Sequence, residues 1–208
     1  MGKRSIMISL LIGVLMSGMF VFSCTSIPEI QVLYRLPAPS MGLQGKSVVL
    51  KIIDKRADKE FLRPGARRQF KYFSGNLSFA VAKYNEAGFK IGPFDPIAVI
   101  KEGFKRRLEN DGIRIVSEPA EGVPELQIIL EEFSLDFVAR QWVATMRYEA
   151  KLLKDSRVLA NQSISGKAER FKILRRKGAD TALGDIFTDT LNRLDLVKLF
   201  HDAHLLNP

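Results

Sequence analysis

Residues suited to catalytic or metal chemistry are few in this chain of 208 residues. The two histidines, His201 and His204, lie three positions apart near the C-terminus, a spacing that suits one helical face. Two imidazoles without a cysteine or a convergent carboxylate make a poor metal site, which favours a surface pair. Glu131 and Glu132 are adjacent in a predicted strand, so they should point to opposite faces and not form an acid and base pair. We therefore expect no metal, no cofactor and no enzymatic activity.

A glycine-containing segment, SMGLQGKS at residues 40 to 47, nearly matches the phosphate-binding pattern G-x-x-x-x-G-K-[ST], but Ser40 replaces the first glycine. That loop must follow a strand and open a helix, whereas this segment precedes a predicted strand. Gly42 and Gly45 are better explained by a turn. The sequence therefore does not predict nucleotide binding.

Positive charge dominates the ionisable residues, with 32 basic against 23 acidic side chains and a net charge of +9. Two groups of basic residues stand out. One contains Arg63, Arg67, Arg68 and Lys71, and the denser one contains Arg170, Lys172, Arg175, Arg176 and Lys177. Such runs often belong to solvated loops, and that alternative stays open. The functional interpretation is contact with anionic lipid or an acidic envelope protein, because each cation near a charged membrane contributes about 1 kcal/mol.

The single cysteine, Cys24, follows a segment with the charge and hydropathy order of a secretory signal. Two basic residues precede an apolar run, and residues 21 to 24, VFSC, resemble the lipobox of bacterial lipoproteins. In that motif a small residue precedes a cysteine that is lipidated and becomes the new N-terminus after cleavage. Ser23 fits the pattern, whereas Phe22 is bulkier than usual. A transmembrane anchor is the alternative, since about 17 apolar residues are the lower limit for spanning a bilayer.

Lipidation at Cys24 implies effectively permanent anchoring, because several tens of CH₂ groups contribute about 0.8 kcal/mol each. Thr25 follows the cysteine, and the absence of Asp at that position favours the outer membrane over the inner one. We predict a signal peptide over residues 1–23, a lipidated tether over 24–45 that lays one edge strand onto the domain, and one domain over 46–208. A protein anchored in this way faces the periplasm, where nucleic acid is not expected as a partner.

Two amphipathic helices are predicted. Asp95 and Pro96 supply an N-cap and a proline at the first helical position, and Gly112 ends the helix that follows. A second helix is expected over residues 179–200, with a break near Asp195. These helices must bury their apolar faces against a sheet.

The predicted strands supply that sheet. Residues 46–54 form a β-branched run, after which Asp54 and Arg56 should share one face as a structural ion pair. Residues 141–154 alternate strictly, which predicts a strand with Trp142 on its buried face. A turn at residues 154–157 should connect this strand to the next one. The expected fold class is α+β, a single domain with a mainly antiparallel sheet and two principal helices packed on one face.

The succession of VVLKIIDKR, ELQIILEEF and ADTALGDIFTDTLNRL resembles the YajG-like family of Gram-negative outer-membrane lipoproteins. The likeness rests on the Cys24 lipobox, a first strand that closes on Asp54-x-Arg56, a helix ended by Gly112, a long hairpin and a closing helix. It implies an outer-membrane lipoprotein with an α+β fold, and it supplies no activity. The layout also resembles, more distantly, ABC-type transport auxiliary lipoproteins.

We therefore expect a non-enzymatic binding or scaffold module anchored in the envelope. The alternative is an auxiliary lipoprotein subunit of an ABC-type lipid or lipopolysaccharide transport system. A stable complex with membrane transport proteins would favour this alternative.

Overall fold

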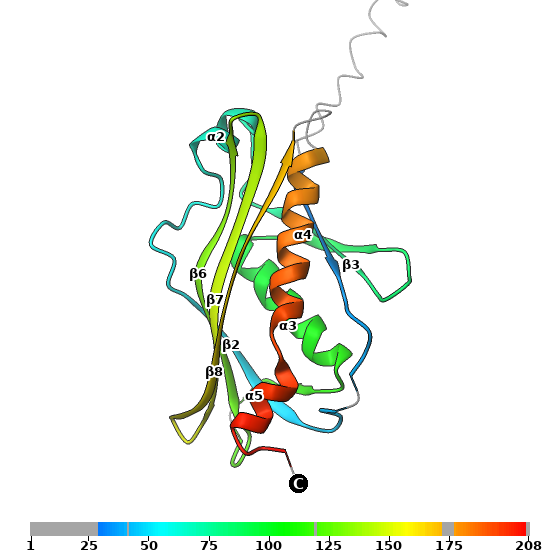
Figure 1. The fold of residues 1–208 in the computed structure, drawn as a ribbon, viewed down its shortest axis with the longest axis vertical. Coiled ribbons are helices and arrows are strands. Elements are labelled where there is room, and N and C mark those ends of the chain that lie inside the picture. The colour runs from blue at the N-terminus through cyan, green and yellow to red at the C-terminus, as the bar shows by residue number, and fades with distance from the viewer. Residues whose placement is uncertain (1–28, 41, 119, 172–176, 207–208) are drawn as a thin grey trace, which may run out of the picture.

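The structure, a computed structural model, describes residues 29–40, 42–118, 120–171 and 177–206 (Figure 1). The predicted signal peptide and Cys24 lie outside these residues. Among the helices that the structure describes, none is both long and apolar enough to cross a membrane.

A five-stranded sheet with strand order β5-β2-β6-β7-β8 forms one side of the molecule (Figure 1). Its long strands β6, β7 and β8 are antiparallel, as predicted, whereas β2 pairs in parallel with both β5 and β6, so the sheet is mixed. Apolar side chains alternate along β7, and Trp142 is fully buried, which confirms the predicted pattern. The strands are β2 (Ser47–Asp54), β5 (Arg114–Val116), β6 (Glu125–Val138), β7 (Gln141–Lys154) and β8 (Arg157–Phe171).

A second sheet has three strands in the order β1-β3-β4. They are β1 (Gln31–Arg35), β3 (Leu77–Ala82) and β4 (Phe89–Phe94). Strand β1 lies at an edge, as expected, but it pairs in parallel with β3, and Val32 and Tyr34 are fully buried. Part of the segment predicted as a tether therefore contributes to the hydrophobic core.

Helices α3 (Pro96–Asn110) and α4 (Lys177–Arg193) pack on one face of the five-stranded sheet, as predicted (Figure 1). Phe187 of α4 contacts Phe133 of β6 on one side and Tyr34 and Phe79 of the second sheet on the other. The helices therefore join both sheets into one core. Asp95 caps α3 by accepting hydrogen bonds from the backbone N–H groups of residues 97 and 98, and its carboxylate lies 2.8 Å from each nitrogen.

The helical conformation is interrupted at residues 194 and 195, before α5 (Leu196–Asp202), which confirms the predicted break near Asp195. A further helix, α2 (Pro64–Gln69), which is not among the two predicted helices, forms in the basic sequence RPGARRQF. Its first N–H groups, on Gly65 and Ala66, donate to the carboxylate of Asp136 on β6 at 2.9 and 3.2 Å. The cap comes from a strand about 70 residues away in sequence, so local sequence does not reveal this helix.

Candidate functional site

The outer face of the five-stranded sheet is the face that points away from α3 and α4. It carries the polar half of the β7 alternation, including Thr145, Arg147, Glu149 and Lys151. Its charges neutralise one another: the Lys151 ammonium lies 3.0 Å from the Glu149 carboxylate, and Lys167 lies 2.6 Å from Glu169. The hydrogen bond from Asn161, and then that from Lys151, lowers the pKa of Glu149. This face is therefore polar, with balanced charge.

The two adjacent glutamates on this face do not behave as the sequence predicts. A β-bulge interrupts the pairing of β6 with β7 between Leu130 and Glu132, so both glutamates reach the same cation. The Arg147 guanidinium lies 3.3 Å from the carboxylates of both Glu131 and Glu132. The prediction that they point to opposite faces is wrong, because the bulge shifts the alternation by one residue. Both carboxylates belong to an ion-pair cluster.

Asp54 and Arg56 form the predicted structural ion pair. The Arg56 side chain is buried and donates two hydrogen bonds to the Asp54 carboxylate, at 3.0 and 3.1 Å. These bonds lower the pKa of Asp54 to about 2 despite partial burial. Arg56 also reaches the carbonyl oxygen of Phe133 at 3.5 Å. The pair fixes the end of β2 against β6.

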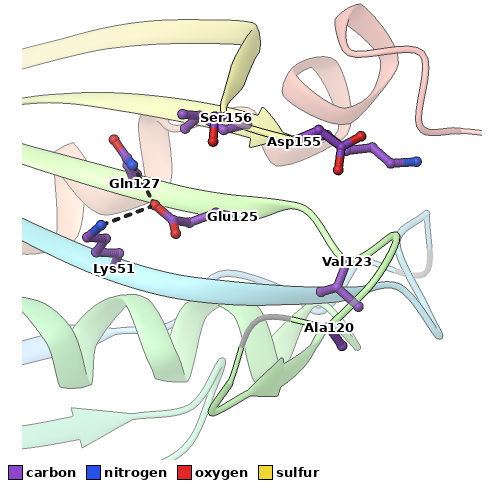
Figure 2. Close-up of a pocket in the computed structure, with 9 residues that line it drawn as sticks. Lys51, Ala120, Val123, Glu125, Gln127, Asp155 and Ser156 are labelled. Atoms are coloured by element: carbon purple, nitrogen blue, oxygen red, sulfur yellow. Dashed lines mark hydrogen bonds and ion pairs between the residues drawn. The ribbon is translucent and has the colours of Figure 1, made fainter.

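The outer face is hollowed near the β7–β8 turn, Asp155–Ser156. This hollow, the Asp155 hollow, has a volume of about 570 Å³ (Figure 2). Figure 2 shows Glu125 between Lys51, 3.7 Å away, and the Gln127 amide, which donates to it. The Asp155 hollow therefore offers hydrogen-bonding groups to a polar partner, and the charge of Glu125 is balanced by Lys51.

A second hollow of about 400 Å³, the Arg140 hollow, lies on the same face beside the β6–β7 turn, Ala139–Arg140. Val138, Gln141, Val143 and Lys167 are among its lining residues. The two hollows lie at opposite ends of β7. The outer face thus carries one hollow near each end of β7.

The predicted absence of metal chemistry is not tested by the fold, but the histidines can be placed. His201 lies in α5 beside Asp202, whereas His204 follows the helix with a left-handed φ of 55°. They do not share one helical face, because the chain leaves the helix between them. In the part of the chain that the structure describes, no three His, Cys, Asp or Glu side chains cluster in a way that could hold a metal ion.

Within the glycine-containing segment, residues 42–45 form a turn that leads into β2. The backbone N–H of Gly45 donates to the carbonyl oxygen of Gly112, and the Lys46 ammonium donates to the carbonyl oxygen of Leu205 at 2.8 Å. Gly45 and Lys46 therefore join distant parts of the fold. A strand follows them, whereas a phosphate-binding loop opens a helix.

The first basic group surrounds α2. Arg63 pairs with Asp58 and lies 3.9 Å from Glu132, and Arg67 pairs with Glu60. Arg68 and Lys71 are exposed, and neither forms an ion pair with a described residue. Acidic side chains therefore balance the charges of Arg63 and Arg67, whereas Arg68 and Lys71 face solvent.

Most of the second basic group falls outside the described residues, namely Lys172, Arg175 and Arg176, and Lys177 is described only as the first residue of α4. Arg170 lies near the end of β8 and pairs with Asp185 of α4. Its guanidinium therefore joins a strand to a helix. Contact of this group with an anionic surface stays a prediction.

Residues that the sequence does not single out gather near the β6–β7 turn. We call this the Arg140 end, formed by the turn itself, α2, Phe171 and the first turn of α4. Val138 is 54% exposed and Phe171 66% exposed, and Arg140 is exposed without a described ion-pair partner. Beneath them, Trp142 packs on Phe70 and Phe137, with ring centroids 5.3 and 4.8 Å apart. Two strong strand patterns separated by two residues give a sequence signal for this turn.

No protein-family model matches this sequence, and no curated protein resembles it closely enough to count as a relative. A similar solved structure is that of a Xanthomonas campestris protein of the DUF330 family, 16% identical, with a TM-score of 0.52. The match covers 81% of this chain and 95% of that one, and it shows a shared fold.

Two lipoprotein structures match less closely. Rare lipoprotein B from Shewanella oneidensis is 11% identical over 76% of this chain and 98% of its own, with a TM-score of 0.39. Lipoprotein GNA1162 from Neisseria meningitidis is 16% identical over 72% of this chain and 97% of its own, with a TM-score of 0.28. The likeness to the YajG-like family stays a prediction.

Proposed function

We propose that this protein is a lipid-anchored, non-enzymatic binding or scaffold module of the cell envelope, held at the outer membrane through Cys24. The observation that carries the proposal is the position of Cys24 relative to both the signal-like segment and the fold. The cysteine follows the apolar run, and the first strand, β1, begins seven residues later, at Gln31. A lipid on Cys24 would hold the domain directly at the membrane surface.

The described residues support a binding role better than an enzymatic one. Acidic groups on the outer face are held in ion pairs, including Glu149 with Lys151 and Glu131 and Glu132 with Arg147. A general base needs a carboxylate whose pKa is raised towards neutrality, whereas the hydrogen bonds to Glu149 lower its pKa. The open, charge-balanced outer face suits an envelope partner with mixed charges.

Metabolic labelling with a palmitate analogue tests the anchor. The wild-type protein and a Ser26→Ala control should be labelled, and Cys24→Ala should not. Equal labelling of the wild type and Cys24→Ala would refute lipidation at this position.

Membrane fractionation of Thr25→Asp, which should move the protein to the inner membrane, separately tests the outer-membrane assignment.

Co-purification from detergent-solubilised envelopes tests the binding role. Mass spectrometry of the captured proteins and lipids should find an envelope component that is lost with Cys24→Ala, because only the anchored protein meets it. A stable complex with membrane transport proteins would support the alternative function, an auxiliary subunit of an ABC-type transport system. Substrate turnover that a single polar substitution abolishes would contradict the non-enzymatic proposal.

A further inference from the structure

We propose that the Arg140 end of the domain rests on the anionic bilayer surface, with Val138 and Phe171 in the head-group region and Arg140 against lipid phosphate. The inference rests on the proposed lipid anchor and adds the orientation and the contact surface. It predicts one defined face of the molecule towards the membrane, which neither Cys24 nor the basic clusters specify.

The start of β1, at Gln31, lies at the Arg140 end. The backbone N–H of Gln31 donates to the Asp180 carboxylate, 2.9 Å away, in the first turn of α4. That turn lies beside Trp142 and the end of β8: a Cβ added to Gly178 would lie 2.8 Å from the Trp142 ring and 2.9 Å from the Phe171 carbonyl oxygen. Figure 1 shows the start of α4, α2 and the β6–β7 turn at the same end of the molecule, with the blue strand β1 starting beside the upper part of α4.

The short connection limits where this end can go. Four residues separate Cys24 from Glu29, so even a fully extended chain spans at most about 18 Å between these two residues. Whatever conformation they adopt, a lipidated Cys24 keeps the start of β1 close to the bilayer. By contrast, the 14 residues of β7 carry the Asp155 turn roughly 45 Å away from the Arg140 turn at the usual rise per residue.

The chemistry of the Arg140 end fits an anionic bilayer. Its exposed apolar side chains include Val138 and Phe171. At the same end, Arg68 of α2 and Arg140 of the turn have no ion-pair partner among the described residues. Aromatic rings favour the membrane interface, and cations gain energy near anionic lipid within about a Debye length. Apolar and cationic groups together therefore match the head-group region.

The opposite end shows why exposure alone does not identify the contact. Val158 beside the β7–β8 turn is 52% exposed, almost the same as Val138, and Arg157 is also exposed there. The two ends differ in their distance from the start of β1, and therefore from Cys24. This pair of turns therefore supplies matched controls within one strand.

The test uses the full lipidated protein reconstituted in vesicles of phosphatidylglycerol and phosphatidylcholine. Because the chain has one cysteine and lipid occupies it, Val138→Cys and Val158→Cys each introduce a single reactive thiol for an environment-sensitive fluorophore. Lipids with a spin label near the head group should quench the probe at residue 138 at least threefold more than the probe at residue 158. In vesicles of phosphatidylcholine alone the difference should shrink.

The same two probes test the contribution of the Arg140 charge to membrane contact. Arg140→Gln should reduce quenching at residue 138 by about half, and added salt should reduce it further, whereas Arg157→Gln should change it little. Equal quenching at residues 138 and 158, or stronger quenching at 158, would overturn the proposed orientation. Vesicle flotation separates this outcome from failure of the anchor: protein that does not float with the vesicles refutes the proposed function itself.

Discussion

The two turns that bound β7 are similar in local geometry and different in their surroundings. Ala139 and Arg140 have φ angles of 48° and 66°, and Asp155 and Ser156 have 50° and 63°, so both pairs form tight left-handed hairpin turns. At the Arg140 end, α2 and an aromatic cluster around Trp142 support the turn. At the Asp155 end, the turn borders the larger hollow, and Val158 and Leu159 beside it are exposed.

This difference shows that turn geometry does not determine how firmly a hairpin end is held. The support comes from residues distant in sequence, chiefly α2 and the start of α4. A domain tethered at one end needs a rigid surface there if the anchor is to set its orientation. Variants at the two ends test whether the Arg140 end is indeed the more tightly packed one.

The largest expected effect is at Trp142. Trp142→Ala removes a fully buried indole from the Phe70 and Phe137 cluster and should lower the free energy of unfolding by about 3–5 kcal/mol. Val158→Ala at the other end should cost under about 0.5 kcal/mol, because that side chain is half exposed. Urea denaturation followed by circular dichroism measures both. Comparable losses for the two variants would contradict the difference in packing.

Gly65 should show the next largest effect. A Cβ on Gly65 would collide with the carbonyl oxygen of Phe137, so Gly65→Ala must push α2 away from β6 and should cost about 1–3 kcal/mol. Gly92→Ala is the control, since its Cβ would meet only the Phe94 ring at an ordinary 3.7 Å. Thermal melts compare the two. If Gly65→Ala melted at the wild-type temperature, α2 would not be tightly docked at the Arg140 end.

The ion pair of Asp54, at the end of β2, should make the free energy of unfolding depend on pH. Arg56 lowers its pKa from 3.8 to about 2, so the folded state holds the carboxylate ionised more strongly than the unfolded chain does. This contribution, about 2 kcal/mol at most, is complete above pH of about 4 and disappears as the pH falls towards 2. Unfolding free energies measured across this range should fall more for the wild type than for Asp54→Asn. Parallel curves would show that the pair does not stabilise the fold.

The smallest expected effect concerns the turns themselves. Left-handed backbone is costly for alanine and tolerated by asparagine, so Ala139→Asn should raise the free energy of unfolding by about 0.5–1 kcal/mol. Asp155→Asn should change it little, because aspartate already tolerates that conformation. The urea midpoints of the two variants give the comparison. A gain at residue 155 equal to that at residue 139 would show that the alanine turn stores no additional strain.

The elements with local signals are predictable from the sequence. The alternation along residues 141–154 correctly gives the buried face of β7, Asp95 and Pro96 mark the start of α3, and the spacing of Asp54 and Arg56 gives their ion pair. What the sequence misses depends on distant partners. Helix α2 is capped by Asp136, and the bulge that turns Glu131 towards Arg147 appears only when β6 pairs with β7.

The candidate functional residues also fall into those that the sequence predicts and those that it misses. Cys24 can be proposed as a lipidation site from its own neighbours, because a lipidation motif is local in sequence. The Arg140 end cannot, since it unites Val138, Phe171 and α2, which come together only through the sheet and the packing of α4. Charge clustering identified Arg68, but it gave no reason to consider Arg140, which stands alone in the sequence.

Hydrogen–deuterium exchange on the unmodified lipidated protein, compared between anionic nanodiscs and detergent micelles, tests the central claim most directly. If the Arg140 end rests on the bilayer, backbone amides at residues 138–141 should exchange more slowly in nanodiscs, whereas those at residues 154–157 should exchange at the same rate in both. Slower exchange at residues 154–157 alone, or at both turns equally, would contradict an orientation set by the short connection from Cys24 to β1.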